Sequence, residues 1–594
     1  MSPKRLRISL VLAGLFAAIP TASSVGGSPA FDPLLADGAR CGPQAGGSPA
    51  LLKTMLPAAT ETSPFQPQPA RPALAEAPVL YDNLGGLSLK AGTSSARAQA
   101  WFDQGVRLAF GFNHAEAQRA FREAQKLDPR CALCYWGEAL VLGPNINAPM
   151  TPEANTAALA ALARAVELAP AAPERDRALI DALGRRYSAD PKAERATLDA
   201  AYAEAMKRVA ERFAADDTVQ ALYAEAMMDT QPWDYWEAGG AKPKGRGADI
   251  VATLETVLKR NPRHAGAIHL YIHAVEASTQ PDRALPYANR LGALMPGAGH
   301  IVHIPAHIYY RVGMYRESLE TNKRAMAADE RYFKTSPSDP LYMAGYYPHN
   351  IHFLMVSAQM GGDGRAAIDA AAKLDASMAP EVVAQFPIMQ PVKAAHYGTH
   401  AQFSAPETIL ALPAPAAGLA LVQAMYHYAR AVAHAQRKDS AAAQREIDAL
   451  ARLEKDTDYK PFAEWAIPAK EIIETARLVA SGRLADARGD LDGAARAYEE
   501  AIFIEDALAY MEPPYWYYPV RQSLGAVRLR QGKLAEAEQA FRDSLARVRN
   551  NGWALAGLAE TYRRKGDANA EKAARQAYAK TWFGAGAGPA IERL

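Results

Sequence analysis

Small and aromatic residues recur at helical spacings along most of this 594-residue chain, and this pattern constrains the fold more than any other feature of the sequence. Residues 100–130 read AWFDQGVRLAFGFNHAEAQRAFREAQKLDPR, in which two amphipathic helices flank a short turn. Residues 489–502 and 525–545 repeat the arrangement, with glycine, alanine and aromatic residues at similar offsets. Such repetition predicts stacked helical hairpins that bury a continuous core between neighbours.

This pattern resembles the tetratricopeptide repeat. In the first segment six anchor positions match that repeat without a gap, and they are Trp101, Gly105, Ala117, Phe121, Ala124 and Pro129. In the middle of the chain, Pro262 and Pro296 end successive helix pairs 34 residues apart, which is the length of such a repeat. The resemblance implies an all-α, tetratricopeptide-like solenoid, built as a superhelix of helix-turn-helix repeats, whose concave face is the usual binding surface.

We divide the repeat region into three parts: N-terminal repeats at 94–260, histidine-rich repeats at 261–378, and C-terminal repeats at 379–594. The stretches AGHIVHIPAH and YMEPPYWYYPVRQSLG are similar to those of exported bacterial tetratricopeptide proteins. That resemblance implies a fold but assigns no chemistry.

The N-terminal region is predicted to direct export. Residues 1–24 show basic residues, then an apolar run, then small residues, which is the pattern of a secretory signal peptide. Residues 25–93 are rich in proline, glycine and alanine, which predicts a disordered linker. We therefore expect a periplasmic or secreted protein. No later stretch is apolar enough for stable membrane insertion, and a net charge of +2 without a basic run gives no reason to expect a nucleic-acid partner.

Three cysteines do not form a disulfide-rich scaffold. Cys131 and Cys134 form the sequence CALC, followed by Tyr135 where c-type haem attachment requires histidine. A local disulfide and a pair of buried thiols are both consistent with this spacing, and a redox-active pair is a third alternative.

Histidines gather in the central repeats. His300, His303 and His307 lie within eight residues, although the whole chain has only 13 histidines. Adding the repeat length to His269 and His273 gives His303 and His307, so two adjacent repeats carry histidine at the same two positions. Residues three or four apart share one face of a helix, so these side chains form a narrow stripe. Pro305 within this stripe predicts that the second helix either begins late or is kinked.

The following repeat, aligned on Gly362 and Ala367, adds His352 in the column of His303 and His349 in the column of His300. Glu276 lies one turn after His273. In tetratricopeptide proteins the first helix of each repeat lines the concave groove, so the resemblance implies that these residues converge there. The candidate metal ligands are His269, His273, Glu276, His300, His303, His307, His349 and His352.

Clustered imidazoles favour a transition metal, because neutral imidazole is a common donor to copper, zinc and iron. The donors exceed one tetrahedral site, which favours a pair of metals. Glu276 is the candidate catalytic residue, as a general base for a metal-bound water, but it is equally interpretable as a ligand or as a partner that orients an imidazole. A polar groove without a metal and a pH-sensing cluster are the other interpretations.

A second surface is predicted around the proline-rich segment YMEPPYWYYPV. Aromatic faces there suit an organic substrate and an arginine suits a carboxylate; the alternative is a rigid inter-repeat turn. The candidate pocket residues are Tyr310, Asn350, Glu512, Trp516 and Arg521. We expect an exported metal-binding protein, with a metal-dependent oxidoreductase favoured and a small organic substrate as its partner. The alternatives are a scaffold that binds a periplasmic protein or peptide, a zinc-dependent hydrolase, and a metal storage or delivery protein.

Overall fold

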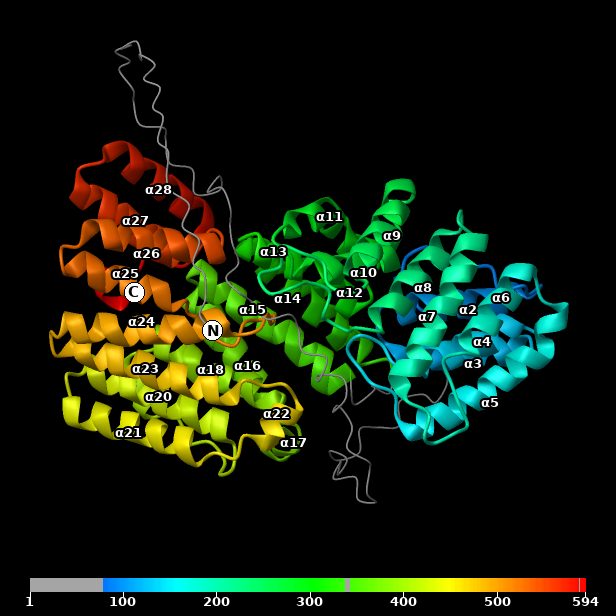
Figure 1. Cartoon of the computed structure of the whole chain (residues 1–594), viewed down its shortest axis with the longest axis horizontal. Helices are drawn as coiled ribbons and strands as arrows, with labels where there is room; N and C mark the ends of the chain where they lie inside the picture. The colour runs from blue at the N-terminus through cyan, green and yellow to red at the C-terminus, as the bar shows by residue number, and fades with distance from the viewer. Residues whose placement is uncertain (1–77, 337–341, 587) are drawn as a thin grey trace, which may run out of the picture.

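The computed structural model describes residues 78–336, 342–586 and 588–594. The predicted signal peptide and most of the predicted linker lie outside these residues. The described chain is an all-α, tetratricopeptide-like solenoid of antiparallel helix pairs (Figure 1). Within it, bridges between extended residues are confined to two isolated pairs, Asn145 with Ala148 and Trp236 with Pro243.

The repeat anchors explain why the helices pair. The Phe121 ring is fully buried between Gly105 and Gly137, where an added Cβ would lie 2.5 Å from the ring. Phe541 occupies the same place between Gly525 and Gly557 near the other end of the array. Glycine at these positions lets an aromatic side chain fill the space between neighbouring helices, which is the packing that the sequence pattern predicts.

The helices of the N-terminal repeats follow one another as hairpins. They are α2 (Ala96–Phe110), α3 (His114–Leu127), α4 (Ala132–Val141), α5 (Pro152–Leu168), α6 (Glu174–Leu183), α7 (Arg195–Arg212), α8 (Asp217–Met228) and α9 (Gly247–Arg260). Cys131 and Cys134, at the start of α4, are joined by a disulfide.

The central repeats carry the histidines. Their helices are α10 (Ala265–Val275), α11 (Leu285–Leu294), α12 (Gly299–His303), α13 (Pro305–Arg311), α14 (Tyr315–Tyr332), α15 (Tyr347–Gly361) and α16 (Gly364–Ala376), and a π-helical turn, η3 (Tyr342–Tyr346), precedes α15.

The C-terminal repeats complete the array. Their helices are α17 (Pro380–Gln385), α18 (Met389–Phe403), α19 (Pro406–Leu410), α20 (Ala420–Gln436), α21 (Ser440–Asp456), α22 (Lys460–Glu464), α23 (Ala469–Ala487), α24 (Leu491–Ala507), α25 (Val520–Arg530), α26 (Leu534–Arg547), α27 (Gly552–Lys565) and α28 (Ala568–Thr581). Short 3₁₀ turns, η1 (Ala169–Ala171), η2 (Pro281–Ala284) and η4 (Ile591–Arg593), connect or end the repeats.

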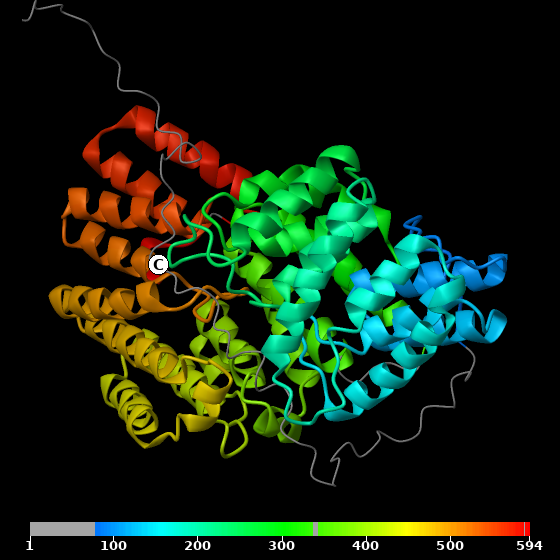
Figure 2. The same cartoon turned by 45° about the vertical axis from the view of Figure 1, so that its right-hand side comes forward.

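The superhelix curls until its last repeats contact its centre, as the turned view in Figure 2 shows for the C-terminal and central helices. The Trp553 indole on α27 donates to the Gln359 carbonyl on α15 at 2.9 Å. The Tyr315 hydroxyl on α14 donates to the Arg549 carbonyl at 2.7 Å. This closure brings the loop between α24 and α25, residues 508–519, against the histidine-bearing helices.

The end of the predicted linker is ordered against the repeats. Leu84 and Leu89 are 3% exposed and belong to the core of the N-terminal repeats. The Gln104 side chain on α2 accepts from the Tyr81 amide and donates to the Val79 carbonyl, each at 2.8 Å. Residues 78–93 are therefore not a free linker, because they bury apolar side chains and satisfy their backbone groups on α2.

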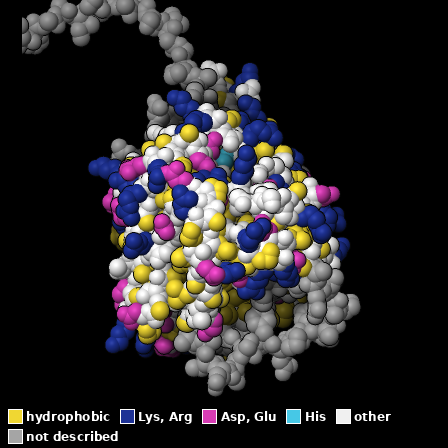
Figure 3. All heavy atoms as spheres, turned by 90° about the vertical axis from the view of Figure 1, so that its right-hand side faces the viewer, with side chains coloured by type: hydrophobic (Ala, Val, Ile, Leu, Met, Phe, Trp, Pro, Cys, Tyr) yellow, Lys and Arg dark blue, Asp and Glu magenta, His cyan; other side chains and the backbone are white. Residues whose placement is uncertain are grey.

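The surface gives no sign of a single-charge patch on the face seen in Figure 3, where acidic and basic side chains are interspersed. None of the helices in the described ranges is long and apolar enough to cross a membrane.

Candidate metal centre

The first helices of three consecutive central repeats, the second of which is broken into α12 and α13, bring seven of the eight predicted ligands together. α10 carries His269 and His273, and Glu276 follows at its C-terminal end. α12 and α13 carry three histidines, and α15 carries His349. Their ligand atoms form three overlapping groups, in each of which the atoms lie within 4.8 Å of one another. The first two groups are referred to below as triad A (His269, His273 and His300) and triad B (His303, His307 and His349).

Triad A holds nitrogen atoms that make no hydrogen bond. His269 Nδ1 lies 2.6 Å from the Phe110 carbonyl, which can only accept, so Nδ1 carries the proton and Nε2 presents a lone pair. His273 Nδ1 lies 2.7 Å from Glu276 Oε1 and donates its proton to that carboxylate, so His273 Nε2 also presents a lone pair. Both Nε2 atoms and both ring nitrogens of His300 are buried without a hydrogen-bond partner among the described residues. Burying a bare polar atom costs about 1–3 kcal/mol, so four of them in one place indicate an absent partner.

Triad B is tighter. His307 Nε2 lies 2.9 Å from His303 Nε2 and 3.4 Å from His349 Nε2. Nitrogens bound to one tetrahedral ion at about 2.0–2.1 Å are separated by about 3.3 Å, so this spacing suits a shared ion. His303 Nδ1 donates to Asn322 Oδ1 at 2.6 Å, and the Asn322 amide is oriented by donating to the Ser318 carbonyl at 2.8 Å. The His303 Nε2 lone pair therefore points toward the other two rings.

Glu276 connects the two triads. One carboxylate oxygen accepts from His273 Nδ1 of triad A, and the other accepts from His307 Nδ1 of triad B, each at 2.7 Å. The Tyr510 hydroxyl, from the 508–519 loop, donates to the same carboxylate at 3.1 Å. Because its oxygens are engaged in this way, Glu276 is placed to orient two imidazoles. The third group of ligand atoms, His273, Glu276 and His307, is this hydrogen-bonded set.

Pro305 interrupts the helix that carries three of these histidines. α12 ends at His303, Ile304 keeps helical dihedrals, and α13 begins at Pro305. Proline has no N–H to donate, so the break lies where the ladder loses a bond. The prediction of a late start or a kink is thus resolved as two short helical segments, and His303 and His307 still meet across the break.

Burial sets the protonation of the cluster. Burial lowers the pKa of His269, His300, His303 and His349 well below the usual value, so these imidazoles are neutral at neutral pH, which is the form that binds metals. For His307 burial acts in the same direction, but the charges of two buried glutamates overcome it and raise the pKa to about 10. In the absence of a metal, His307 is therefore an imidazolium that donates from Nδ1 to Glu276 and from Nε2 to His303 Nε2, and its charge holds the pKa of Glu276 low.

Aromatic rings enclose both triads. Phe112 packs on His269 with ring centroids 4.5 Å apart, and Trp233 packs edge-on to His273 at 4.9 Å. Tyr346 covers His300 at 4.5 Å, and Phe353 covers His307 at 4.6 Å. These rings limit contact with water, and the histidines of both triads are buried except His349, which is partly exposed. The sequence predicted that these residues converge in a concave groove, and loops from the N-terminal and C-terminal repeats, which carry Trp233 and Tyr510, cover them there.

Two predicted residues lie outside the centre. His352 donates to or accepts from the Tyr517 hydroxyl at 2.9 Å and belongs to neither triad. Its ring packs edge-on to the Tyr517 ring of the 508–519 loop, with ring centroids 5.3 Å apart, so it is held away from triad B. Asn350 is fully buried and donates to Asp329 at 2.7 Å, so it does not line the predicted pocket.

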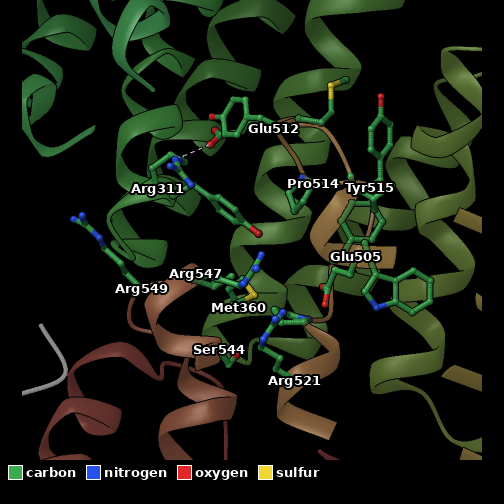
Figure 4. A pocket seen from close by; sticks show the side chains of 18 of the residues that line it. Arg311, Met360, Glu505, Glu512, Pro514, Tyr515, Arg521, Ser544, Arg547 and Arg549 are labelled. Atoms are coloured by element: carbon green, nitrogen blue, oxygen red, sulfur yellow. Dashed lines mark ion pairs between the residues drawn. The ribbon is translucent and has the colours of Figure 1, made fainter. Parts of the chain in front are cut away.

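The other predicted pocket residues do surround a cavity. Tyr310, Glu512, Trp516 and Arg521 line a space of 140 Å³ beside the 508–519 loop (Figure 4). Glu512 separates this cavity from triad B, because its Oε2 atom lies 3.5 Å from His307 Nδ1. Arg521 binds Asp506 through two hydrogen bonds of 2.6 Å.

Several residues of the site carry no repeat signal in the sequence. Phe112 and Trp233 lie in loops between helices, with positive φ angles of 54° and 63°. Asn322 lies on the second helix of its repeat, where no histidine marks it. Tyr510 lies within the proline-rich segment that the sequence already singled out.

The fold and this site together define an all-α, tetratricopeptide-like solenoid with a buried histidine centre. No known protein family and no curated protein sequence matches the chain. Among solved structures, it is similar to the APC/C hetero-tetramer Cut9-Hcn1 (13% identity, 79% of this chain and 77% of that chain covered, TM-score 0.28). It is also similar to the human IFIT1 dimer with m7Gppp-AAAA, with 14% identity, 82% of this chain and 91% of that chain covered, and a TM-score of 0.29. Yeast Tom70 is similar with 11% identity, 80% of this chain and 90% of that chain covered, and a TM-score of 0.25. At these values the likenesses carry no inference about activity.

Proposed function

We propose that this protein holds two transition-metal ions side by side, one in triad A and one in triad B, and that it acts as an exported, metal-dependent oxidoreductase. The observation that carries the proposal is the convergence of bare imidazole nitrogens. Their opposite ring nitrogens are hydrogen-bonded to Phe110, Glu276 and Asn322, which leaves the Nε2 lone pairs directed into the chamber.

The donor set supports copper, zinc or iron ahead of magnesium, calcium or manganese. Each triad offers three imidazole nitrogens, and the carboxylate between them, Glu276, accepts from the Nδ1 atoms of His273 and His307. Imidazole suits copper, zinc and iron, whereas carboxylate-rich sites suit magnesium, calcium and manganese. Three protein ligands leave an open position on each ion, which a catalytic site requires. Two such ions would supply electron exchange with a bound organic molecule.

The chain itself contributes orientation and exclusion of water. Glu276 fixes one imidazole of each triad, so the two halves of the site are mechanically linked. Phe112 and Phe353 shield the chamber from bulk solvent. The signal-peptide pattern of residues 1–24 supports a periplasmic or secreted location for this chemistry.

A scaffold role is the second candidate, and one observation favours it. The C-terminal repeats enclose a cavity of 650 Å³ lined by Tyr428, Trp516, Tyr518 and Arg483, among others. Aromatic and arginine side chains in a concave surface suit a peptide or protein partner. In this alternative the histidines would serve as internal hydrogen-bonding groups.

Elemental analysis of protein purified without an affinity tag tests the proposal. We expect close to two copper, zinc or iron ions per chain, and loss of both in the His269→Ala/His303→Ala double variant. The matched control is His427→Ala, because His427 lies on α20 and pairs with Glu446. Oxygen consumption with phenolic substrates then separates an oxidoreductase from a hydrolase or a storage protein. Protein that stays metal-free after incubation with each ion would refute the proposal.

A further inference from the structure

A cavity of 170 Å³ lies where the ordered segment 78–93 crosses the turn after α2 and the C-terminal end of α14. It shares no lining residue with the cavity beside the 508–519 loop or with the cavity of the C-terminal repeats. The proposed function makes no use of this space, so its chemistry is a separate question.

Three tyrosine rings form walls of this cavity. Tyr81 comes from segment 78–93, Tyr332 from α14 and Tyr342 from η3. The Tyr81 and Tyr332 rings have centroids 6.2 Å apart and planes at 59°, and the Tyr332 and Tyr342 rings have centroids 5.9 Å apart and planes at 67°. Rings set at such steep angles border a space on more than one side. Because the face of an aromatic ring attracts a cation within about 6 Å, these walls suit a cationic ligand.

A buried carboxylate in the same wall lacks a cation. Asp329 is fully buried, and its two oxygens accept from the Tyr342 hydroxyl at 2.9 Å and from the Asn350 amide at 2.7 Å. Both donors are neutral, and burial raises the pKa of Asp329 to about 7 without an opposing cation among the described residues. At Gly299 an added Cβ would lie 1.8 Å from the carboxylate, so this glycine makes room for it. An uncompensated buried carboxylate is costly, and a cation in the cavity would compensate it.

The other charged groups near the cavity do not supply that compensation. Arg331 also lines the cavity, but its side chain is exposed, so solvent screens its charge. Glu330 pairs with Lys373 on the outer surface. Glu116, on the far side of the tyrosine wall, pairs with Arg119 at 3.0 Å. The acidic groups around the cavity thus have their own partners, apart from the carboxylate in its wall.

The hydrogen bonds already present select the kind of cation. A primary ammonium group has three N–H donors that each need an acceptor. Each oxygen of Asp329 already accepts one hydrogen bond, and the walls are otherwise largely aromatic and apolar. A quaternary ammonium group has no N–H donor and binds through its charge and its methyl groups, which is the chemistry of aromatic cages.

We propose that this cavity binds the trimethylammonium group of a small quaternary amine, with Tyr81, Tyr332 and Tyr342 as the cage and Asp329 as the counter-charge. The site adjoins the metal centre, because the Tyr342 hydroxyl also accepts from the His300 amide at 3.1 Å. Binding of the amine does not depend on the proposed function, since none of these four residues is a proposed metal ligand.

Calorimetry on the intact protein with choline, ethanolamine and 3,3-dimethylbutanol tests the assignment. The last compound has the shape of choline but carries carbon in place of the charged nitrogen. We expect choline to bind most tightly, because ethanolamine brings N–H donors and dimethylbutanol brings no charge. This ranking needs no variant, so it remains decisive if a variant fails to fold. Absence of choline binding at millimolar concentrations, or equal binding of choline and dimethylbutanol, would overturn the assignment.

Two variants locate the site. Tyr332→Leu should weaken choline binding about twofold to thirtyfold, which is the range for one cation–π contact. Asp329→Asn should weaken it at least about tenfold, because the counter-charge is lost. Glu330→Gln is the matched control on α14, because Glu330 does not line the cavity, and it should leave the affinity unchanged. Choline binding that neither Tyr332→Leu nor Asp329→Asn weakens would contradict this location.

Vesicles of phosphatidylcholine distinguish a free amine from the same group on a lipid. Vesicle binding that choline displaces would support the cage with the lipid headgroup as its source. No vesicle binding together with choline binding would support a free amine. Vesicle binding by protein that does not bind choline would overturn the proposal.

Discussion

Replacing Glu276 by glutamine should weaken metal binding at one of the two proposed sites and leave the other nearly unchanged. In the structure the carboxylate accepts from Nδ1 of His273 and Nδ1 of His307, so both rings present Nε2 to the chamber. A glutamine amide has the same shape but only one oxygen, and its NH₂ group donates. The imidazole that faces the NH₂ group must turn its own Nδ1 lone pair toward it. Its proton then moves to Nε2, where the metal should bind.

The size of the effect follows from the loss of one oriented ligand. Removing a partner that fixes a metal-bound histidine lowers metal affinity about 10–100-fold, which corresponds to about 1.4–2.7 kcal/mol. Only one triad can lose its ligand in this way, because the amide oxygen still accepts from the other ring. Glu276→Gln should therefore retain one ion at nearly unchanged affinity and bind the second about 10–100-fold more weakly.

Competition titration against a chelator of known affinity measures both constants. Glu317→Gln is the matched control, since Glu317 is an exposed glutamate in the first turn of α14. Two ions bound by the Glu276→Gln variant with unchanged affinities would show that the carboxylate does not orient the triads. Equal weakening of both ions would show that Glu276 is itself a shared ligand.

Three further outcomes are expected. His349→Ala should remove the ion of triad B, whereas His352→Ala should leave the metal content unchanged in elemental analysis; loss of metal in the second variant would contradict the assignment. The pKa of His307 is raised to about 10, so the metal-free protein holds an extra proton on this ring at pH 7. A metal must displace that proton, so the metal affinity of triad B should rise about tenfold per pH unit between pH 7 and 10. Calorimetry in buffers of different ionisation enthalpy measures the proton release. A metal affinity that does not change with pH would contradict the raised pKa of His307. Phe541→Ala should destabilise the C-terminal repeats by about 3–5 kcal/mol in denaturant unfolding, compared with almost no change for Phe503→Ala, whose side chain is 80% exposed.

The repeat pattern was sufficient to predict the fold and the gathering of histidines. Gly105 and Phe121 lie at repeat anchor positions and pack against each other within one helix pair, so the repeat pattern predicts their contact directly. His269, His273, His303 and His307 lie on neighbouring first helices, and the equal repeat length brings them together. These contacts depend only on helix geometry and stacking, which the sequence encodes repeat by repeat.

The remainder of the site depends on how far the superhelix curls, which no local pattern encodes. Tyr510 and Glu512 reach the centre from more than one repeat away along the solenoid. The exclusion of His352 depends on Tyr517 from the 508–519 loop, whose hydroxyl lies 2.9 Å from His352 Nε2. The role of Glu276 was left open because a sequence shows neighbours along one helix but not the ring of His307 that approaches from the next.

The contact between Tyr510 and Glu276 joins residues 234 positions apart, and it exists only once the final repeats have docked against the middle of the chain. Before docking, an ion held by the histidines would exchange freely with solvent. After docking, release of a bound ion would require the C-terminal repeats to separate from the central repeats, so its retention would depend on the rate of that opening as well as on bond strength.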